Sequence, residues 1–198
     1  MSTNDYSTTS CSGQYYNMFI KSDQETFDKR KKLIDETLKP ACAKAGEADY
    51  LASQSLYSAK GVYTTAQYKN NQFKKMIKDL QDKKKLAEDN ARKAALAKGM
   101  SIAEADEMAE MAGKSVQREI DGMLFNSSTQ ITKDLAQSKT LFEQKSEDSR
   151  IAHSQYMSAD LNLDTELFSQ KMLAADINKN TGFYNFLRVA EEGRGWSV

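Results

Sequence analysis

The chain has 198 residues, of which 39% are hydrophobic and 28% are charged, and the charges cancel to a net charge of zero. The hydrophobic share is below the ~45–50% usual for a globular domain, so a single compact core would be lean, whereas helices that bury one stripe need less apolar area. Zero net charge argues against nucleic acid as the main partner, because phosphate binding depends on Lys and Arg.

One proline in the whole sequence favours long uninterrupted helices, since proline breaks helix interiors. Alternating β-branched runs, which are typical of strands, are missing. The sequence therefore predicts an all-α fold, an elongated helical bundle with one very long central helix and several further helices. Cys11 and Cys42 are expected to be free thiols, because two cysteines make no disulfide framework.

Residues 1–21 are rich in Ser, Thr and Asn and form a polar N-terminal arm, most of which we expect to be disordered in a free monomer. The arm has neither the basic nor the apolar segment of a secretory signal. No apolar run approaches the ~18–20 residues that span a bilayer. We therefore expect that any export would use a route without a cleaved signal.

The elongated helical domain is predicted over residues 22–178. Ser22 and Glu25 have the spacing of a capping box, which predicts the start of a first helix. Pro40 either ends this helix or starts the next.

The very long helix is predicted over residues 41–98, because every seventh residue from Ala45 is apolar. Small side chains at that spacing allow two helices to approach closely. The sequence predicts a helix-packing interface made of Ala45, Ala52, Ala59, Ala66, Phe73, Leu80, Ala87 and Ala94. The row four residues further on is mixed, beginning with Asp49 and Leu56, so the pattern is no strict leucine-zipper seam.

Gly99 predicts the C-terminus of this helix, and Ser101 with Glu104 predicts a capping box that opens a third helix. Residues 126–129 are interpreted as a break or a restart, and a last helix is expected at about 164–175. Residues 179–198 form an aromatic C-terminal tail. Its side chains are expected to dock on a partner, through Phe183, Tyr184, Phe186 and Trp196.

Catalytic and metal-binding patterns are weak. His153 is the only histidine, so one chain cannot form a multi-histidine metal site, and no nucleophile-elbow or phosphate-loop motif occurs. Asp176 and Asn178 fit the start of a calcium loop, but Leu187 stands where a bidentate Glu belongs. The lysines between residues 74 and 85 alternate with acidic residues, which is typical of a solvated face. The sequence predicts a non-enzymatic protein without metal or cofactor.

From residue 45 to residue 175 the chain resembles, in overall character, the small internal virion (ejection) proteins of short-tailed bacteriophages. Those are also signal-free, proline-poor, Ala/Gln/Ser-rich helical chains of about this size. No motif carries the resemblance, so it assigns no functional residue. The chain departs from the family at its N-terminus, where some members have an apolar segment and this one has "STNDYSTTSCSG".

The resemblance implies a structural viral protein of the virion, a coiled-coil subunit that helps to build a channel for DNA passage. Its partners would be further copies of the chain, as a homo-oligomer, and other structural proteins such as a portal or tail ring. Nucleic acid would be a partner only by passage, and membrane binding is weakly supported because the stripe is alanine-rich. Two alternatives stay open: a secreted filament or translocator subunit of a bacterial export machine, and a cytosolic coiled-coil adaptor or chaperone.

Overall fold

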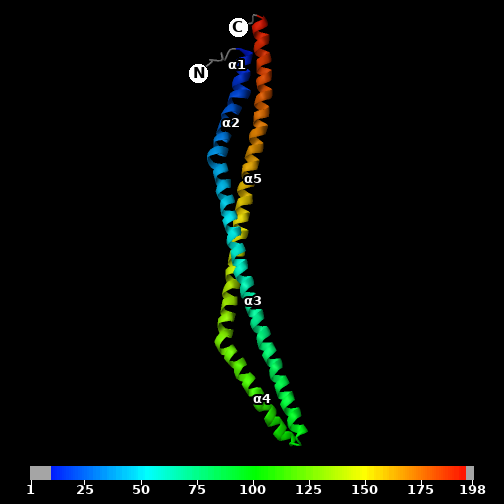
Figure 1. The fold of residues 1–198 in the computed structure, drawn as a ribbon. Helices are drawn as coiled ribbons and strands as arrows, with labels where there is room; N and C mark the ends of the chain where they lie inside the picture. Colours follow the sequence, from blue (N-terminus) through cyan, green and yellow to red (C-terminus); the bar gives the residue numbers. More distant parts are fainter. Residues whose placement is uncertain (1–9, 195–198) are drawn as a thin grey trace. The chain divides into compact units, whose positions relative to one another are not determined.

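The computed structural model describes residues 10–194, and only the backbone of Arg194. Every element in this range is helical and none is a strand, so the all-α prediction is confirmed (Figure 1). The elements are α1 (Cys11–Tyr16), the π-helical η1 (Asn17–Lys21), α2 (Ser22–Leu33), the π-helical η2 (Ile34–Leu38), α3 (Lys39–Ala97), α4 (Ile102–Met123), the π-helical η3 (Leu124–Ser128) and α5 (Thr129–Arg194).

The chain divides into two compact units. Unit 1 combines the segments Met1–Leu51 and Arg150–Val198, and unit 2 is Ala52–Ser149. In the described part of unit 1, contacts pair early residues with late ones in reverse order: Ser12 with Glu191, Arg30 with Glu166, and Asp49 with His153. Unit 1 is therefore an antiparallel pair of helical segments, α1 to the first part of α3 against the last part of α5.

Unit 2 is a helical hairpin that turns at residues 98–101. Gly99 has φ 81°, a left-handed conformation that favours glycine. The N–H of Met100 bonds to the carbonyl of Ala95 at 3.2 Å and the N–H of Gly99 to that of Leu96 at 3.0 Å, which is the pattern of a Schellman motif. Ser101 and Glu104 form a complete capping box at the start of α4. Both local predictions for this turn are confirmed.

The capping box gives a pH-dependent prediction. The Ser101 hydroxyl and backbone N–H donate to the Glu104 carboxylate at 2.7 and 2.8 Å, and these bonds, the hydroxyl first, hold the pKa of Glu104 below its ordinary 4.5. A carboxyl with a lowered folded pKa stabilises the fold above its unfolded pKa, and this contribution is lost as the pH falls through the folded value.

Ser101→Ala should therefore lower the free energy of unfolding by about 1 kcal/mol at neutral pH. The acid-induced loss of stability that comes from Glu104 should be smaller in the variant. Urea unfolding of both proteins at several pH values measures both effects. A variant as stable as the parent at neutral pH would contradict the role of the box.

The prediction of a single very long helix is wrong, because the described part of the chain has two. Helix α3 has 59 residues, close to the predicted 41–98, but α5 is longer, with 66 residues. The predicted break at 126–129 is the π-helical η3, and the expected last helix at 164–175 lies inside α5. Residues 179–194 also belong to α5, so the segment expected as a separate tail is helical as far as Arg194.

The N-terminal arm also differs from its prediction. Residues 11–21 are helical, and α1 begins after Ser10, whose hydroxyl accepts a hydrogen bond from the Gly13 N–H at 3.0 Å. Residues 1–9 lie outside the described residues. The predicted capping box at Ser22 is wrong, because the residue before it is already helical and no side chain caps α2.

Pro40 is the second residue of α3, and the helical path continues through it. The π-helical η2 comes directly before, and there the N–H of Lys39 bonds to the carbonyl of Ile34, five residues back. A proline cannot donate such a bond and its ring crowds the carbonyl four residues earlier. The wider π turn accommodates the proline without ending the helix, which is why Pro40 marks no break.

Candidate functional site

A seam of side chains with reduced exposure runs along α3 at alternating steps of three and four residues. All its members are buried or half-buried: Cys42, Ala45, Asp49, Ala52, Leu56, Ala59, Tyr63, Ala66, Asn70, Phe73, Ile77, Leu80, Lys84, Ala87 and Ala91. Steps of three and four average 3.5 residues, the repeat of a coiled coil. The row that begins at Asp49 contains both polar and apolar residues, and it forms half of the seam. The sequence predicted only the other half, the alanine row.

Helix α5 presents a matching row without interruption from Ile131 to Glu191. Its members are also buried or half-buried: Ile131, Leu135, Ser138, Phe142, Lys145, Ser149, Ala152, Tyr156, Ala159, Leu163, Glu166, Gln170, Leu173, Ile177, Asn180, Tyr184, Leu187 and Glu191. Each unit is therefore a two-stranded antiparallel coiled coil, and its seam contains polar as well as apolar side chains.

Seven of the eight predicted interface residues lie on this seam. Ala59 and Leu80 are 4% and 7% exposed, and the other five are half-buried. Ala94 is exposed, and its neighbour Ala95 is buried in its place, 4% exposed. Two contacts show that this face of α3 is turned toward α4 and α5. The ring of Tyr63 stacks on that of Phe142 at 5.6 Å, and Lys84 donates to Gln117 at 2.8 Å. In this structure the alanine row thus faces helices of the same chain.

Polar pairs cross the seam of unit 1. The Ser12 hydroxyl and N–H donate to the Glu191 carboxylate at 2.5 and 3.1 Å, which lowers the pKa of Glu191. The guanidinium of Arg30 contacts Glu166 at 2.6 Å. The Cys42 thiol lies 3.7 Å from the carboxylate of Asp160, and burial, before that charge, raises the pKa of Cys42. These pairs fix the register of the two strands.

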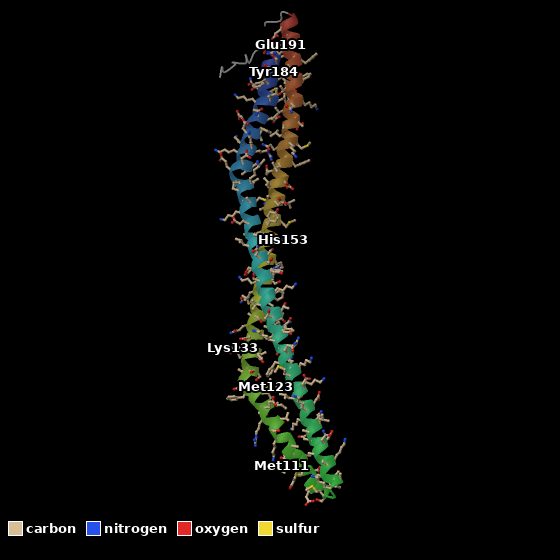
Figure 2. The ribbon with its side chains drawn as sticks, viewed as in Figure 1. Met111, Met123, Lys133, His153, Tyr184 and Glu191 are labelled. Carbon is tan, nitrogen blue, oxygen red and sulfur yellow. The ribbon has the colours of Figure 1, made fainter. Side chains whose placement is uncertain are left out.

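Of the predicted tail residues, Tyr184 lies on the seam and Phe183 contacts the opposite strand beside it. Tyr184 is 8% exposed and its ring lies 5.6 Å from that of Tyr16. Phe183 meets the ring of Tyr15 edge-on at 5.0 Å. Figure 2 shows Tyr184 and Glu191 on the part of α5 that accompanies α1. Phe186 is 66% exposed, and Trp196 lies outside the described residues.

His153 takes part in a surface pair rather than in a catalytic arrangement. Its ring Nδ1 lies 3.1 Å from an Asp49 carboxylate oxygen, and its side chain is 63% exposed. Among the residues that the structure describes, no group of three or more His, Cys, Asp or Glu side chains could hold a metal ion.

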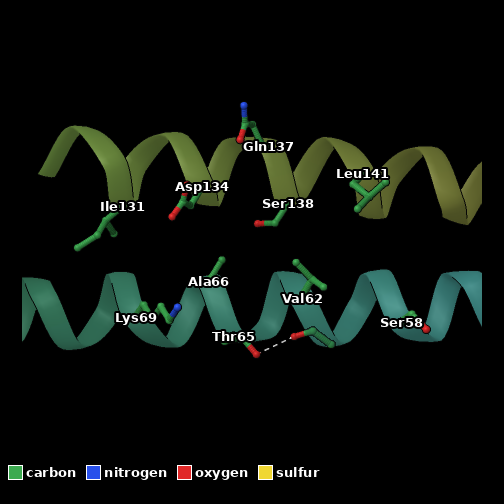
Figure 3. Close-up of a pocket in the computed structure, with 11 residues that line it drawn as sticks. Ser58, Val62, Thr65, Ala66, Lys69, Ile131, Asp134, Gln137, Ser138 and Leu141 are labelled. Carbon is green, nitrogen blue, oxygen red and sulfur yellow. Dashed lines mark hydrogen bonds between the residues drawn. The ribbon is translucent and has the colours of Figure 1, made fainter. Parts of the chain in front are cut away.

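Unit 2 carries a groove of about 700 Å³ between α3 and α5 (Figure 3). Its lining includes Val62 and Leu141, which are 53% and 40% exposed, and the buried Ser138. Lys69 and Asp134 bring charge to the same space. The full lining is Ser58, Gly61, Val62, Thr65, Ala66, Lys69, Ile131, Asp134, Gln137, Ser138 and Leu141. Such a groove can accept apolar side chains of a neighbouring helix.

Comparison of the chain with protein-family models, with curated proteins and with solved structures finds no match. Within residues 10–194, no helix combines the length and the apolar character needed to cross a membrane. The sequence and the geometry are therefore the basis of any functional proposal.

Proposed function

We propose that the chain is a non-enzymatic structural subunit that assembles with other helical subunits through the outer faces of its helices. The observation that carries this proposal is the exposure of large apolar side chains away from the seam. Tyr57 and Phe125 are 80% and 87% exposed, and Leu161 and Phe168 are 67% and 65% exposed. Large exposed apolar areas mark interaction sites.

The reason for this exposure is the construction of each unit. In a two-stranded coiled coil each helix has one neighbour, and that neighbour buries only one stripe of its surface. Within the described residues, Ile34 is the largest side chain that is fully buried. An apolar outer face then gains its burial free energy, ~25 cal/mol per Å², only from another molecule. Further helices packed on the outer faces would provide it.

The setting that we propose for this assembly is the virion, on the resemblance to internal virion proteins of short-tailed bacteriophages. The subunits would line a portal-tail axis with copies of themselves and of ring proteins. Quantitative mass spectrometry of purified particles tests the setting. The chain should occur in a fixed ratio to the capsid protein, and its absence from the particles would reject the virion while leaving assembly itself untouched.

Assembly is tested by unfolding the full chain in urea over a concentration range of about 1–100 μM. Association that covers the folded subunits stabilises them by mass action, so the midpoint should rise with protein concentration. A midpoint that does not change over this range would reject the proposed function.

A further inference from the structure

We infer that the outer face of α5 in unit 1 pairs with the same face of a second copy of this chain, antiparallel and about a twofold axis at Ala175. This inference rests on the proposed function and names the partner and the surface. The surface, called the outer stripe below, follows the three-and-four spacing of a coiled coil. It consists of Leu161, Thr165, Phe168, Met172, Ala175, Lys179, Gly182, Phe186 and Val189.

The outer stripe lies opposite the seam of the same helix and is free of intramolecular cover. All nine residues are exposed. Its large members are 67% (Leu161), 65% (Phe168), 53% (Met172), 66% (Phe186) and 61% (Val189) exposed. The stripe is therefore a second coiled-coil face, and the described part of the chain supplies no helix to cover it.

The area is sufficient for a specific dimer. The stripe spans 28 residues, or ~42 Å of helix. With ~150–250 Å² for a whole aromatic side chain and somewhat less for Leu, Met and Val, the exposed parts of the five large residues amount to about 500 Å² in each copy. Burying all of this surface gives the pair roughly 1,000 Å², the lower bound of a specific interface.

The order of residues along the stripe is self-complementary when it is read backwards. Leu161 and Val189 each lie fourteen residues from Ala175, and Phe168 and Gly182 each lie seven residues from it. An antiparallel twofold thus places Phe168 over Gly182 of the copy, and Ala175 against Ala175. A Cβ built on Gly182 would meet no atom within 4 Å, so the space for the ring is open. Large against small is how close-packed interfaces fill space.

A parallel pair is disfavoured by the same residues. It would set Phe168 against Phe168 and leave a gap between two glycines at 182. The lysines do not separate the two arrangements, because in the antiparallel pair Lys179 faces Lys171 of the copy, each four residues from Ala175. The aliphatic stem of Lys179 can pack beside Met172 there while its ammonium reaches water. A closed twofold contact of this kind uses one patch on both copies.

The stripe is also continuous with the intramolecular interface. The ring of Phe186 stacks on Phe183 at 6.2 Å, and Phe183 contacts Tyr15 at 5.0 Å. The C-terminal end of the outer stripe therefore rests on side chains that the fold already holds in place.

Cysteine cross-linking in the full chain tests the arrangement, in a background with Cys11→Ser and Cys42→Ser. Under mild oxidation Ala175→Cys should form a disulfide-linked dimer with itself. Leu161→Cys alone should remain unlinked, but should link to Val189→Cys when the two variants are mixed. Self-linking of Leu161→Cys, or no linking of Ala175→Cys, would overturn the inference.

A charge substitution gives a second readout. Phe168→Glu should weaken self-association at least ~10-fold, because each dimer loses two buried rings. Leu51→Glu, which also puts a charge at a large exposed apolar residue of unit 1 but outside the stripe, should leave the affinity of this pair unchanged. Equal effects of the two variants would overturn the assignment to the stripe.

The outcome also separates the two proposals. A concentration-dependent unfolding midpoint without an Ala175 cross-link would reject the outer stripe and leave the structural-subunit proposal standing. A midpoint independent of concentration, with no cross-link, would reject both.

Discussion

Deletion of Gln67 from α3 should lower the free energy of unfolding by more than about 3 kcal/mol, although the side chain of Gln67 is exposed. Removing one residue turns the rest of the helix by ~100° relative to the part before it. Lys74, Lys78 and Gln81 would then occupy the seam positions of Phe73, Ile77 and Leu80. Full burial of such a side chain is worth about 1.5–3 kcal/mol, and with Leu80 buried and Phe73 and Ile77 half-buried the three together lose more than that. Urea unfolding followed by circular dichroism measures it.

Deletion of Asn126 from η3 is the matched control in the same unit. The seam positions between residues 105 and 131 are one residue too far apart for a regular alternation of steps of three and four. A π turn absorbs one such extra residue. Removing Asn126 should convert η3 to α-helix and keep both flanking stretches in phase. We expect a change within about 1 kcal/mol. Equal losses from the two deletions would contradict the seam as the source of stability in unit 2.

Ile34→Ala should lower the free energy of unfolding by about 2 kcal/mol or more, because Ile34 is 2% exposed and the substitution leaves a cavity. Ile34 begins η2, where the widened turn keeps this side chain on the seam. Thermal or urea unfolding of the purified variant measures the loss.

The neighbouring Leu33→Ala is its control, since Leu33 is 43% exposed and contributes less burial. Its loss should stay below about 1 kcal/mol. If the two alanine variants were equally stable, the inward position of Ile34 in η2 would be wrong.

The turn at residues 98–101 could be predicted from sequence because its signals are local. Gly99 supplies the left-handed conformation, and Ser101 with Glu104 supplies donors and acceptors three residues apart. The alanine row of α3 could be predicted for a similar reason, since a repeat of apolar residues is visible without knowledge of the partner helix.

Helix α5 was divided into pieces because its seam is partly polar. Lys145, Ser149, Glu166 and Gln170 occupy inward positions, and a pattern of apolar residues cannot show that they continue the helix. For Glu166 the burial is compensated by a contact with a distant segment, the guanidinium of Arg30. Such compensation depends on the register of the two strands, which no single stretch of sequence contains.

The π-helical segments were recognised only in part, for a different reason. Residues 126–129 were interpreted as a break or a restart, and Pro40 follows η2 closely, but neither signal distinguishes a π turn from the end of a helix. For η3 the further signal is the extra residue between two stretches of the seam. That signal becomes visible once the seam is known on both sides of the segment. The outer stripe of α5 was missed likewise, because its residues can be recognised as a second face only when the inner face has been assigned.

The account depends most on the claim that the outer apolar faces are covered by other subunits. Light scattering coupled to size exclusion on the full chain at micromolar concentration tests it directly. The account predicts a mass of at least twice that of the 22.3 kDa chain. A single species of 22.3 kDa at every concentration would contradict it.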